Sequence, residues 1–467
     1  MHKYGQGDFL KEKKMSAIAA ISTPNAPGGI AVIRISGDTA FEVADAVFRS
    51  VNGKKACEMS GYTCAYGFAY DGDERIDDCI LTVFRAPNSY TGENVAEISC
   101  HGGLYVTKRI LRTVLENGAE TASAGEFTKR AFINGKIDLT QAEAVMDIIS
   151  AKGEKELKMA EILREGAAFK KSQSAKEKLI KVLGDLAAWA DYPEDDIPEV
   201  EPETLKNSLY EIRSELAELI KGYDYGRILR DGIDTVIIGR PNVGKSTLFN
   251  CLSGCERSIV TDIAGTTRDV IEESVKIGDL MLRLSDTAGI RETDDIIEGI
   301  GVDIAYKRLD EAELIIAVFD GSCPLEKDDL ALLERLSGKR AIVVINKSDV
   351  SRKIDFDRIN ELNIQPVYIS AKENSGIDEI HTAIENLFEA SEINFESPLA
   401  ANERQKRCID LSLQNIDEAI SAIDSGIMLD AVTVLLDEAV QYILELTGEK
   451  ATEAVVDEVF SRFCVGK

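Results

Sequence analysis

Residues 239–246 read Gly-Arg-Pro-Asn-Val-Gly-Lys-Ser and have the G-x-x-x-x-G-K-[ST] spacing of a phosphate-binding P-loop. Gly239 and Gly244 let the backbone turn where a side chain would clash, so that its N–H groups face phosphate oxygens. The apolar run 233–238 predicts a buried strand before the loop, and residues 246–253 predict a helix after it. Phosphates held by the loop would then lie at a helix N-terminus, where anions are favoured.

Two side chains of the loop have predicted chemical roles. Lys245 reaches the β- and γ-phosphates and is a candidate catalytic residue, and the Ser246 hydroxyl is a Mg²⁺ ligand. A glycine-rich turn without a ligand is the alternative for the octapeptide alone. Three further nucleotide motifs follow in order, each at the C-terminal end of a predicted strand, and they favour the P-loop.

These three motifs select the base and indicate GTP. Asp286-Thr287-Ala288-Gly289 supplies an aspartate for Mg²⁺ and a glycine N–H for the γ-phosphate. Asp349 can accept hydrogen bonds from N1–H and the 2-amino group of guanine, two donors that adenine lacks. A backbone N–H of residues 370–372 can face the guanine O6. The GTP-binding residues predicted from the motifs are Asn242, Val243, Gly244, Lys245, Ser246, Thr247, Asp286, Thr287, Ala288, Gly289, Asn346, Lys347, Asp349, Ser370, Ala371 and Lys372.

The composition limits partners and compartment. The chain of 467 residues carries 54 basic and 82 acidic side chains, a net charge of −28, which argues against broad non-specific binding to nucleic acid. Basic residues gather at 170–181 and 404–407, where solvated helix faces are the favoured interpretation. We expect a cytoplasmic protein without a membrane span, because no apolar run reaches about 20 residues and no signal peptide opens the chain. The nine scattered cysteines fit free thiols.

The pattern along the chain predicts a multidomain protein. Residues 1–14 read as a disordered leader, and residues 15–135 as a compact N-terminal α+β domain. Residues 136–222 and 389–467 are helical by periodicity, on either side of a Ras-like α/β P-loop domain at 223–388. Each helical piece has an apolar face that needs a partner. We therefore expect one all-α domain made of both pieces, into which the P-loop domain is inserted.

Local patterns within the N-terminal domain predict individual elements. Strands are expected at 29–35, 76–84 and 94–100, and helices at 38–49 and 103–116.

Several further segments carry a family resemblance: Ile-Arg-Ile-Ser-Gly (33–37), Tyr-Thr-Gly-Glu (90–93), Cys-His-Gly-Gly (100–103), Gly-Glu-Phe-Thr-Lys-Arg-Ala-Phe (125–132), Asp-Ile-Ala-Gly-Thr-Thr-Arg-Asp (262–269) and Phe-Cys-Val-Gly-Lys (463–467). With the P-loop, they make residues 15–467 resemble the MnmE (TrmE) family of tRNA-modification GTPases. One departure is Asn25-Ala26-Pro27 before a Gly-Gly pair that an arginine commonly precedes in the family.

The resemblance implies a function that the motifs alone do not. Family members act with a FAD-dependent partner, MnmG (GidA), to place an aminomethyl or carboxymethylaminomethyl group on carbon 5 of the wobble uridine of certain tRNAs. A 5-formyl- or methylene-tetrahydrofolate supplies the one-carbon unit, and the N-terminal domain binds it and forms a homodimer. The positions that match folate-contacting residues are Arg34, Glu97, Lys136 and Lys467. Cys464 is either a direct participant or a small buried residue.

The resemblance also assigns the hydrolytic machinery. Ile290 stands where Ras-like switches carry a water-orienting glutamine. Glu298 matches the family's catalytic glutamate and replaces that glutamine. The loop that matches the family's nucleotide-binding loop comprises Thr261, Asp262, Ile263, Ala264, Gly265, Thr266 and Thr267. The implied K⁺ ligands are Asn242, Thr261, Ile263 and Thr266, and the implied Mg²⁺ ligands are Ser246 and Thr267.

Two alternatives are a ribosome-assembly GTPase and a signalling switch that depends on exchange factors. The first is disfavoured because the chain has neither a second GTPase domain nor a basic tail. At the other end, Phe460 and Phe463 lie at helical spacing, so residues 463–467 are expected to end a helix that packs against the protein.

Overall fold

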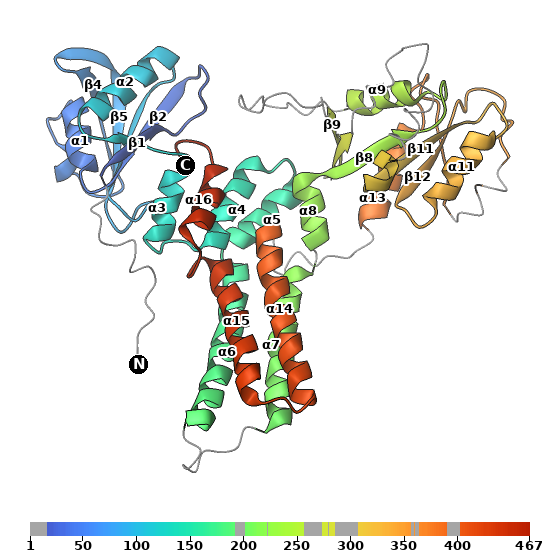
Figure 1. The fold of residues 1–467 in the computed structure, drawn as a ribbon. Coiled ribbons are helices and arrows are strands. Elements are labelled where there is room, and N and C mark those ends of the chain that lie inside the picture. Colours follow the sequence, from blue (N-terminus) through green and yellow to red (C-terminus); the bar gives the residue numbers. More distant parts are fainter. Residues whose placement is uncertain are drawn as a thin grey trace. The chain divides into compact units, whose positions relative to one another are not determined.

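The computed structural model describes residues 16–191, 201–221, 223–255, 273–278, 280–284, 307–355, 359, 364–389 and 402–467. The chain forms two compact units. The first combines residues up to 150 with 160–221 and 398–467, and the second combines 151–159 with 222–397. The multidomain fold class is confirmed. The individual domain limits stay predictions, because the first unit includes both the N-terminal and the helical parts (Figure 1).

The N-terminal part is built on a mixed sheet. Within the described residues its strand order is β3-β4-β5-β6-β2-β1-β7, antiparallel except for the parallel pair β1–β7. Its strands are β1 (Ile18–Ile21), β2 (Ile30–Ser36), β3 (Phe48–Ser50), β4 (Thr63–Asp71), β5 (Glu74–Phe84), β6 (Val95–His101) and β7 (Glu120–Thr121). Alternate residues such as Ile33, Leu81 and Ile98 are fully buried beneath α1 (Ala40–Val47) and α2 (Leu104–Glu116). A short 3-10 helix, η1, spans Ala56–Glu58.

The expected elements of this domain are present, with one shortened. The helix expected at 38–49 ends at Val47, because Phe48 turns extended and pairs with Ala69 of β4. Strands β1, β3, β4 and β7 were not predicted.

The helical part of the first unit is built on a bundle of long helices (Figure 1). They are α6 (Ala167–Asp191), α7 (Pro202–Ile220), α14 (Glu403–Asp424) and α15 (Leu429–Thr447). Helix α14 packs on α15 and α7, and α6 packs on α7 and α15. Leu205, Leu209, Ile212 and Leu216 of α7 recur at helical spacing and are buried. The two sequence pieces therefore cover each other's apolar faces. Shorter helices of this unit are α3 (Glu126–Ile133), α4 (Leu139–Ser150) and α16 (Glu453–Ser461), and α5 (Glu154–Arg164) is divided between the two units.

The basic stretches of these helices are ion-paired rather than merely solvated. Lys171 of α6 pairs with Glu218 of α7 at 2.6 Å, and Lys176 of α6 pairs with Glu449, just after α15, at 2.7 Å. Arg404 forms a bidentate ion pair with Glu143, in which both contacts are 2.8 Å long. The prediction of a solvated face is wrong for Lys176 and Arg404, whose side chains are only 12% and 18% exposed, because carboxylates distant in sequence face them.

The second unit contains a sheet covered on both faces. In the described part of the chain its order is β13-β12-β11-β8-β10-β9, parallel except for β9, which runs antiparallel to β10. The strands are β8 (Ile233–Ile238), β9 (Glu273–Ile277), β10 (Leu280–Leu284), β11 (Leu314–Asp320), β12 (Ala341–Asn346) and β13 (Val367–Tyr368). The helices are α8 (Tyr223–Asp231), α9 (Lys245–Cys255), α11 (Lys327–Leu336) and α13 (Ile377–Glu389).

Two apolar clusters flank this sheet. Leu248 of α9 and Ile384 of α13 pack on one face, and Leu332 and Leu336 of α11 pack on the other. Every residue of β12 is buried, as expected for a parallel strand covered on both sides. Among the described residues, no helix has the length and apolar character needed to cross a membrane.

Candidate functional site

The P-loop lies between β8 and α9, and its two glycines are fixed by close contacts. A Cβ on Gly239 would lie 2.2 Å from the carbonyl oxygen of Val318, and one on Gly244 would lie 2.2 Å from Nδ2 of Asn346. Gly244 also has φ +98, which side chains rarely adopt. The loop therefore presents bare backbone, as close binding of phosphate requires.

Lys245 is held over the start of this loop. Its ammonium donates to the carbonyls of Gly239 (2.8 Å) and Arg240 (2.7 Å). Burial lowers the pKa of Lys245, since the charged form loses hydration. A phosphate anion would compensate that loss. Ser246 and Thr247 follow at the exposed start of α9, where a hydroxyl is open to an ion.

Asn346 connects the P-loop to the base-recognition segments. Its Nδ2 donates to the carbonyl of Val243 (2.7 Å), and its Oδ1 accepts from the backbone N–H groups of Ala371 (3.0 Å) and Lys347 (2.8 Å). The amide thus ties together three loops that follow β8, β12 and β13. Ligands of open parallel sheets bind at this carboxyl edge.

The aspartate assigned to guanine is oriented by its neighbour. The hydroxyl of Ser370 donates to Asp349 Oδ1 at 2.7 Å, and this bond lowers the pKa of Asp349. An ionised carboxylate can accept both guanine donors. Lys347 Nζ lies 2.5 Å from Asp320, at the end of β11. Lys372 is exposed beside Ala371.

The structure therefore brings together the part of the nucleotide site that it describes. The remaining predicted residues lie outside the described residues: Thr261, Asp262, Ile263, Ala264, Gly265, Thr266, Thr267, Asp286, Thr287, Ala288, Gly289 and Glu298.

A second polar site lies in the N-terminal domain. Arg34 of β2 and Glu97 of β6 are directly opposite in the sheet, and their side chains pair at 2.8 Å. The Arg34 guanidinium lies 5.4 Å from the ring centre of Tyr90 and 5.6 Å from that of Phe127, within cation–π range. The Tyr90 hydroxyl is hydrogen-bonded to that of Thr128 at 2.8 Å. The arginine is therefore fixed from three sides.

Residues 463–467 reach this second site from α16. Phe460 and Phe463 are buried beside Leu139, which confirms that the segment is anchored. The helix itself ends at Ser461, however, and Val465 makes an antiparallel bridge with Ala124. The expectation of a helical end is wrong here, because backbone groups of the N-terminal domain satisfy this segment.

Lys467 completes the second site. Its carbonyl accepts from the N–H of Phe127 at 3.0 Å. Burial lowers the pKa of Lys467, and the positive charge of Arg34 lowers it further while Glu97 opposes this change. Three of the four predicted folate residues are thus neighbours: Arg34, Glu97 and Lys467.

The other two candidates of this region are placed differently. Lys136 Nζ donates to the carbonyl of Pro87 at 3.0 Å, and its side chain lies against Gly92. Cys464 is exposed, and its carbonyl accepts from Gly125 N–H at 3.4 Å.

A buried network of charged side chains adjoins the second polar site. It gives a structural role to two of the segments that carry the family resemblance. Arg130, 4% exposed, pairs with Glu93 at 3.2 Å and with Glu126 at 3.0 Å. Burial alone would raise the pKa of Glu126, but hydrogen bonds from Ser123 and Arg130 lower it. The network joins segment 90–93 to α3. The roles of Tyr90 and Phe127 did not follow from these segments, since no local spacing in the sequence marks either residue.

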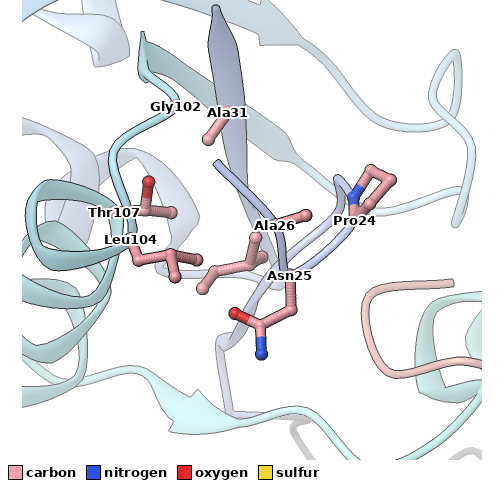
Figure 2. Close-up of a pocket in the computed structure, with 8 residues that line it drawn as sticks. Pro24, Asn25, Ala26, Ala31, Gly102, Leu104 and Thr107 are labelled. Carbon is pink, nitrogen blue, oxygen red and sulfur yellow. The ribbon is translucent and has the colours of Figure 1, made fainter. Parts of the chain in front are cut away.

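A small pocket in the N-terminal domain is a weaker candidate (Figure 2). It lies between the residues that precede β2 and the start of α2. Its lining consists of Ile21, Pro24, Asn25, Ala26, Ala31, Gly102, Leu104 and Thr107. None of these is ionisable and none is a predicted site residue, so nothing there recognises a charged ligand.

The fold and the nucleotide site define the class of protein: a P-loop GTPase whose nucleotide domain is joined to an N-terminal α+β domain and a helical bundle. The family descriptions agree, with "GTP-binding protein TrmE N-terminus" matching residues 17–136 and "MnmE helical domain" matching residues 139–464. This chain belongs to the MnmE (TrmE) family of tRNA modification GTPases.

Similar proteins cover almost the whole chain. A tRNA modification GTPase MnmE from Acetivibrio thermocellus is 43% identical over 463 residues, 97% of this chain and 100% of that protein. Those from Clostridioides difficile and Geobacillus kaustophilus are 41% and 42% identical, over 96% and 97% of this chain and 99% and 100% of their own lengths. Among solved structures, the FeoB G domain from Methanococcus jannaschii has a TM-score of 0.26 at 23% identity and covers 34% of this chain and 97% of its own. The full-length relatives show that the chain is a GTP-binding hydrolase that takes part in tRNA modification.

Proposed function

We propose that this GTPase acts with a FAD-dependent MnmG (GidA) partner on the wobble uridine of certain tRNAs. The product carries an aminomethyl or carboxymethylaminomethyl group at carbon 5. The observation that carries the proposal is the polar site of Arg34, Glu97 and Lys467, which draws on both ends of the chain. A site assembled from two domains suits a reaction that must be coordinated with the nucleotide domain.

The chemistry of this site fits a reduced folate. The glutamate tail of a folate is anionic, and its pterin ring carries an amide-like edge with paired N–H donors. Arg34 and Lys467 would hold the anionic groups, and the Glu97 carboxylate would accept from the pterin edge. Lys136 would add a cation beside the loop at Gly92. A 5-formyl- or methylene-tetrahydrofolate supplies the one-carbon unit when bound.

For hydrolysis we propose Mg²⁺ bound by Ser246 and Thr267, and Glu298 as the group that orients the attacking water. A K⁺ ion would lie beside Asn242, with Thr261, Ile263 and Thr266 completing its oxygen ligands. Asn242 supports this proposal because it is exposed and has φ +62, so its side chain projects from the loop rather than into the core. Oxygen donors suit both hard cations.

We also propose that the chain forms a homodimer through its N-terminal domain, in the cytoplasm where tRNAs are modified. The open face of the N-terminal sheet supports this proposal, since Tyr66 and Ile80 lie opposite each other there and are 54% and 46% exposed. Adjacent apolar side chains on an open sheet face favour a partner surface.

Calorimetric titration of the full chain with 5-formyl-tetrahydrofolate tests the folate site. Arg34→Ala should weaken binding roughly 10- to 100-fold, as expected for loss of a charge-assisted hydrogen bond of about 1.5–3 kcal/mol. Arg112→Ala is the matched control, because it removes an exposed arginine of the same domain that pairs with Asp71. Equal affinities in Arg34→Ala and the unaltered chain would overturn the assignment.

A further inference from the structure

The side chain of Arg240, the second residue of the P-loop, pairs with two carboxylates at the start of α11. Its Nε lies 2.9 Å from a carboxylate oxygen of Asp329, and a second nitrogen pairs with Glu326. The Arg240 side chain is 18% exposed and that of Asp329 only 4%. This contact is therefore a largely desolvated ion pair at the edge of the phosphate site.

Asp329 is itself fixed from a second direction. It lies in the first turn of α11, where its carboxylate accepts the backbone N–H of Glu326 at 3.0 Å. A carboxylate in the first turn of a helix is also stabilised by the helix dipole. The partner of Arg240 is thus held rigidly by α11, and α11 packs on the sheet through Leu332 and Leu336.

The backbone of Arg240 contacts Lys245 of the P-loop directly. Its carbonyl accepts from Lys245 Nζ at 2.7 Å, beside the carbonyl of Gly239. Gly239 is pressed against Val318, where a Cβ would lie 2.2 Å from the carbonyl oxygen. The side chain of Arg240 therefore anchors the peptide that sets the position of Lys245.

We propose that Arg240 and Asp329 form a positioning pair for the phosphate site. The pair fixes the first turn of the P-loop against α11, so that Lys245 and the loop N–H groups are arranged before nucleotide binds. The Arg240 side chain is directed to Glu326 and Asp329, so the role proposed for it is one of position. Preorganisation of this kind improves binding because the bound geometry costs no rearrangement. The inference concerns nucleotide binding alone and does not depend on the folate site or the tRNA product.

Binding of fluorescent GDP and GTP analogues to the full chain tests the pair. Arg240→Ala and Asp329→Asn should each weaken binding about tenfold or more, because a small displacement of positioning groups has large effects. The double variant should bind no more weakly than the worse single variant, since both remove one interaction. The nucleotide affinity of Arg240→Lys should lie between those of the unaltered chain and Arg240→Ala, because an ammonium cannot bridge Asp329 and Glu326 as a planar guanidinium does.

Lys339→Ala is the matched control. Lys339 follows the other end of α11, where it pairs with Asp310 and donates to the carbonyl of Leu309 at 3.3 Å. If Arg240 merely secured α11, Lys339→Ala would weaken nucleotide binding to a similar degree. That result would overturn the proposal, as would unchanged affinity in folded Asp329→Asn and Arg240→Lys. Melting temperatures of all variants separate loss of binding from loss of fold, and Arg240→Lys retains the test if Arg240→Ala does not fold.

Discussion

The hydroxyl of Ser22, which directly follows β1, donates a hydrogen bond of 3.0 Å to the backbone carbonyl of Gly466. The contact is close enough to exclude a side chain, since a Cβ on Gly466 would lie 2.2 Å from the carbonyl oxygen of Ile21. Gly466 also has φ +98. These contacts hold residues 463–467 in a defined position beside β1, next to Arg34.

Gly466→Ala should displace residues 463–467 from β1. This change should abolish wobble-uridine modification while leaving GTP hydrolysis nearly intact. The added methyl group collides with Ile21, whereas the nucleotide site lies in the other unit. Nucleoside mass analysis and phosphate release measure the two activities. Gly426→Ala is the control, because Gly426 has φ +67 but no neighbour within 4 Å of an added Cβ. Modification retained in Gly466→Ala, or in a folded deletion of 463–467, would show that the segment only packs.

Asn242→Gly should abolish the difference between K⁺ and Na⁺ in GTP hydrolysis. Glycine keeps the left-handed backbone at φ +62 and removes the side-chain oxygen, so the loop geometry is preserved. The unaltered chain should hydrolyse GTP faster in K⁺ than in Na⁺, because the cation offsets charge that develops on the phosphates. Steady-state rates in the two chloride salts provide the measurement. Equal rates in the unaltered chain would contradict the potassium site.

Glu298→Ala should lower the rate of hydrolysis by roughly 10² or more while GTP affinity is retained, since a group that positions water acts in the transition state. Single-turnover phosphate release and equilibrium binding distinguish the two effects. Asp294→Ala serves as the control, because we expect that residue to be a solvated loop charge. Near-normal turnover in Glu298→Ala would refute its role.

Glu143→Ala should destabilise the helical part of the first unit by about 3 kcal/mol or more, the usual cost of leaving a buried charge unpaired. Arg404 makes both contacts to Glu143 and also donates to the carbonyls of Glu445 and Leu446, so its charge would remain in place.

The exposed pair Arg213–Asp417 offers the control for this prediction, and Asp417→Ala should cost about 1 kcal/mol or less. Urea unfolding followed by circular dichroism measures both variants. Similar unfolding midpoints in the two would mean that the Arg404–Glu143 pair contributes no more than a surface contact.

Local sequence predicted the strand and helix on either side of the P-loop well, because the information for this segment is contiguous. The strand expected at 233–238 coincides with β8, and the P-loop glycines are required by the contacts they make. The role of Asn346 as a link between loops did not follow from its motif. That link depends on how β8, β12 and β13 lie side by side.

Long-range contacts limited the rest of the prediction. Nothing near Arg404 in the sequence indicates Glu143 as its partner, and nothing near Arg240 indicates Asp329. Lysines that read as solvated on one helix are paired once α7 and α15 lie beside α6. Likewise, the helix expected to include residues 463–467 ends at Ser461, because the N-terminal domain offers backbone partners to the segment that follows.

Mass analysis of wobble uridines tests the central claim most directly, namely that this GTPase modifies tRNA through a site shared by both ends of the chain. Cells that lack the chain should contain unmodified wobble uridines in the affected tRNAs. Return of the unaltered chain should restore the modified nucleoside, and return of Gly466→Ala should not, although both proteins hydrolyse GTP. Full modification in cells without the chain, or equal restoration by the two proteins, would contradict the account.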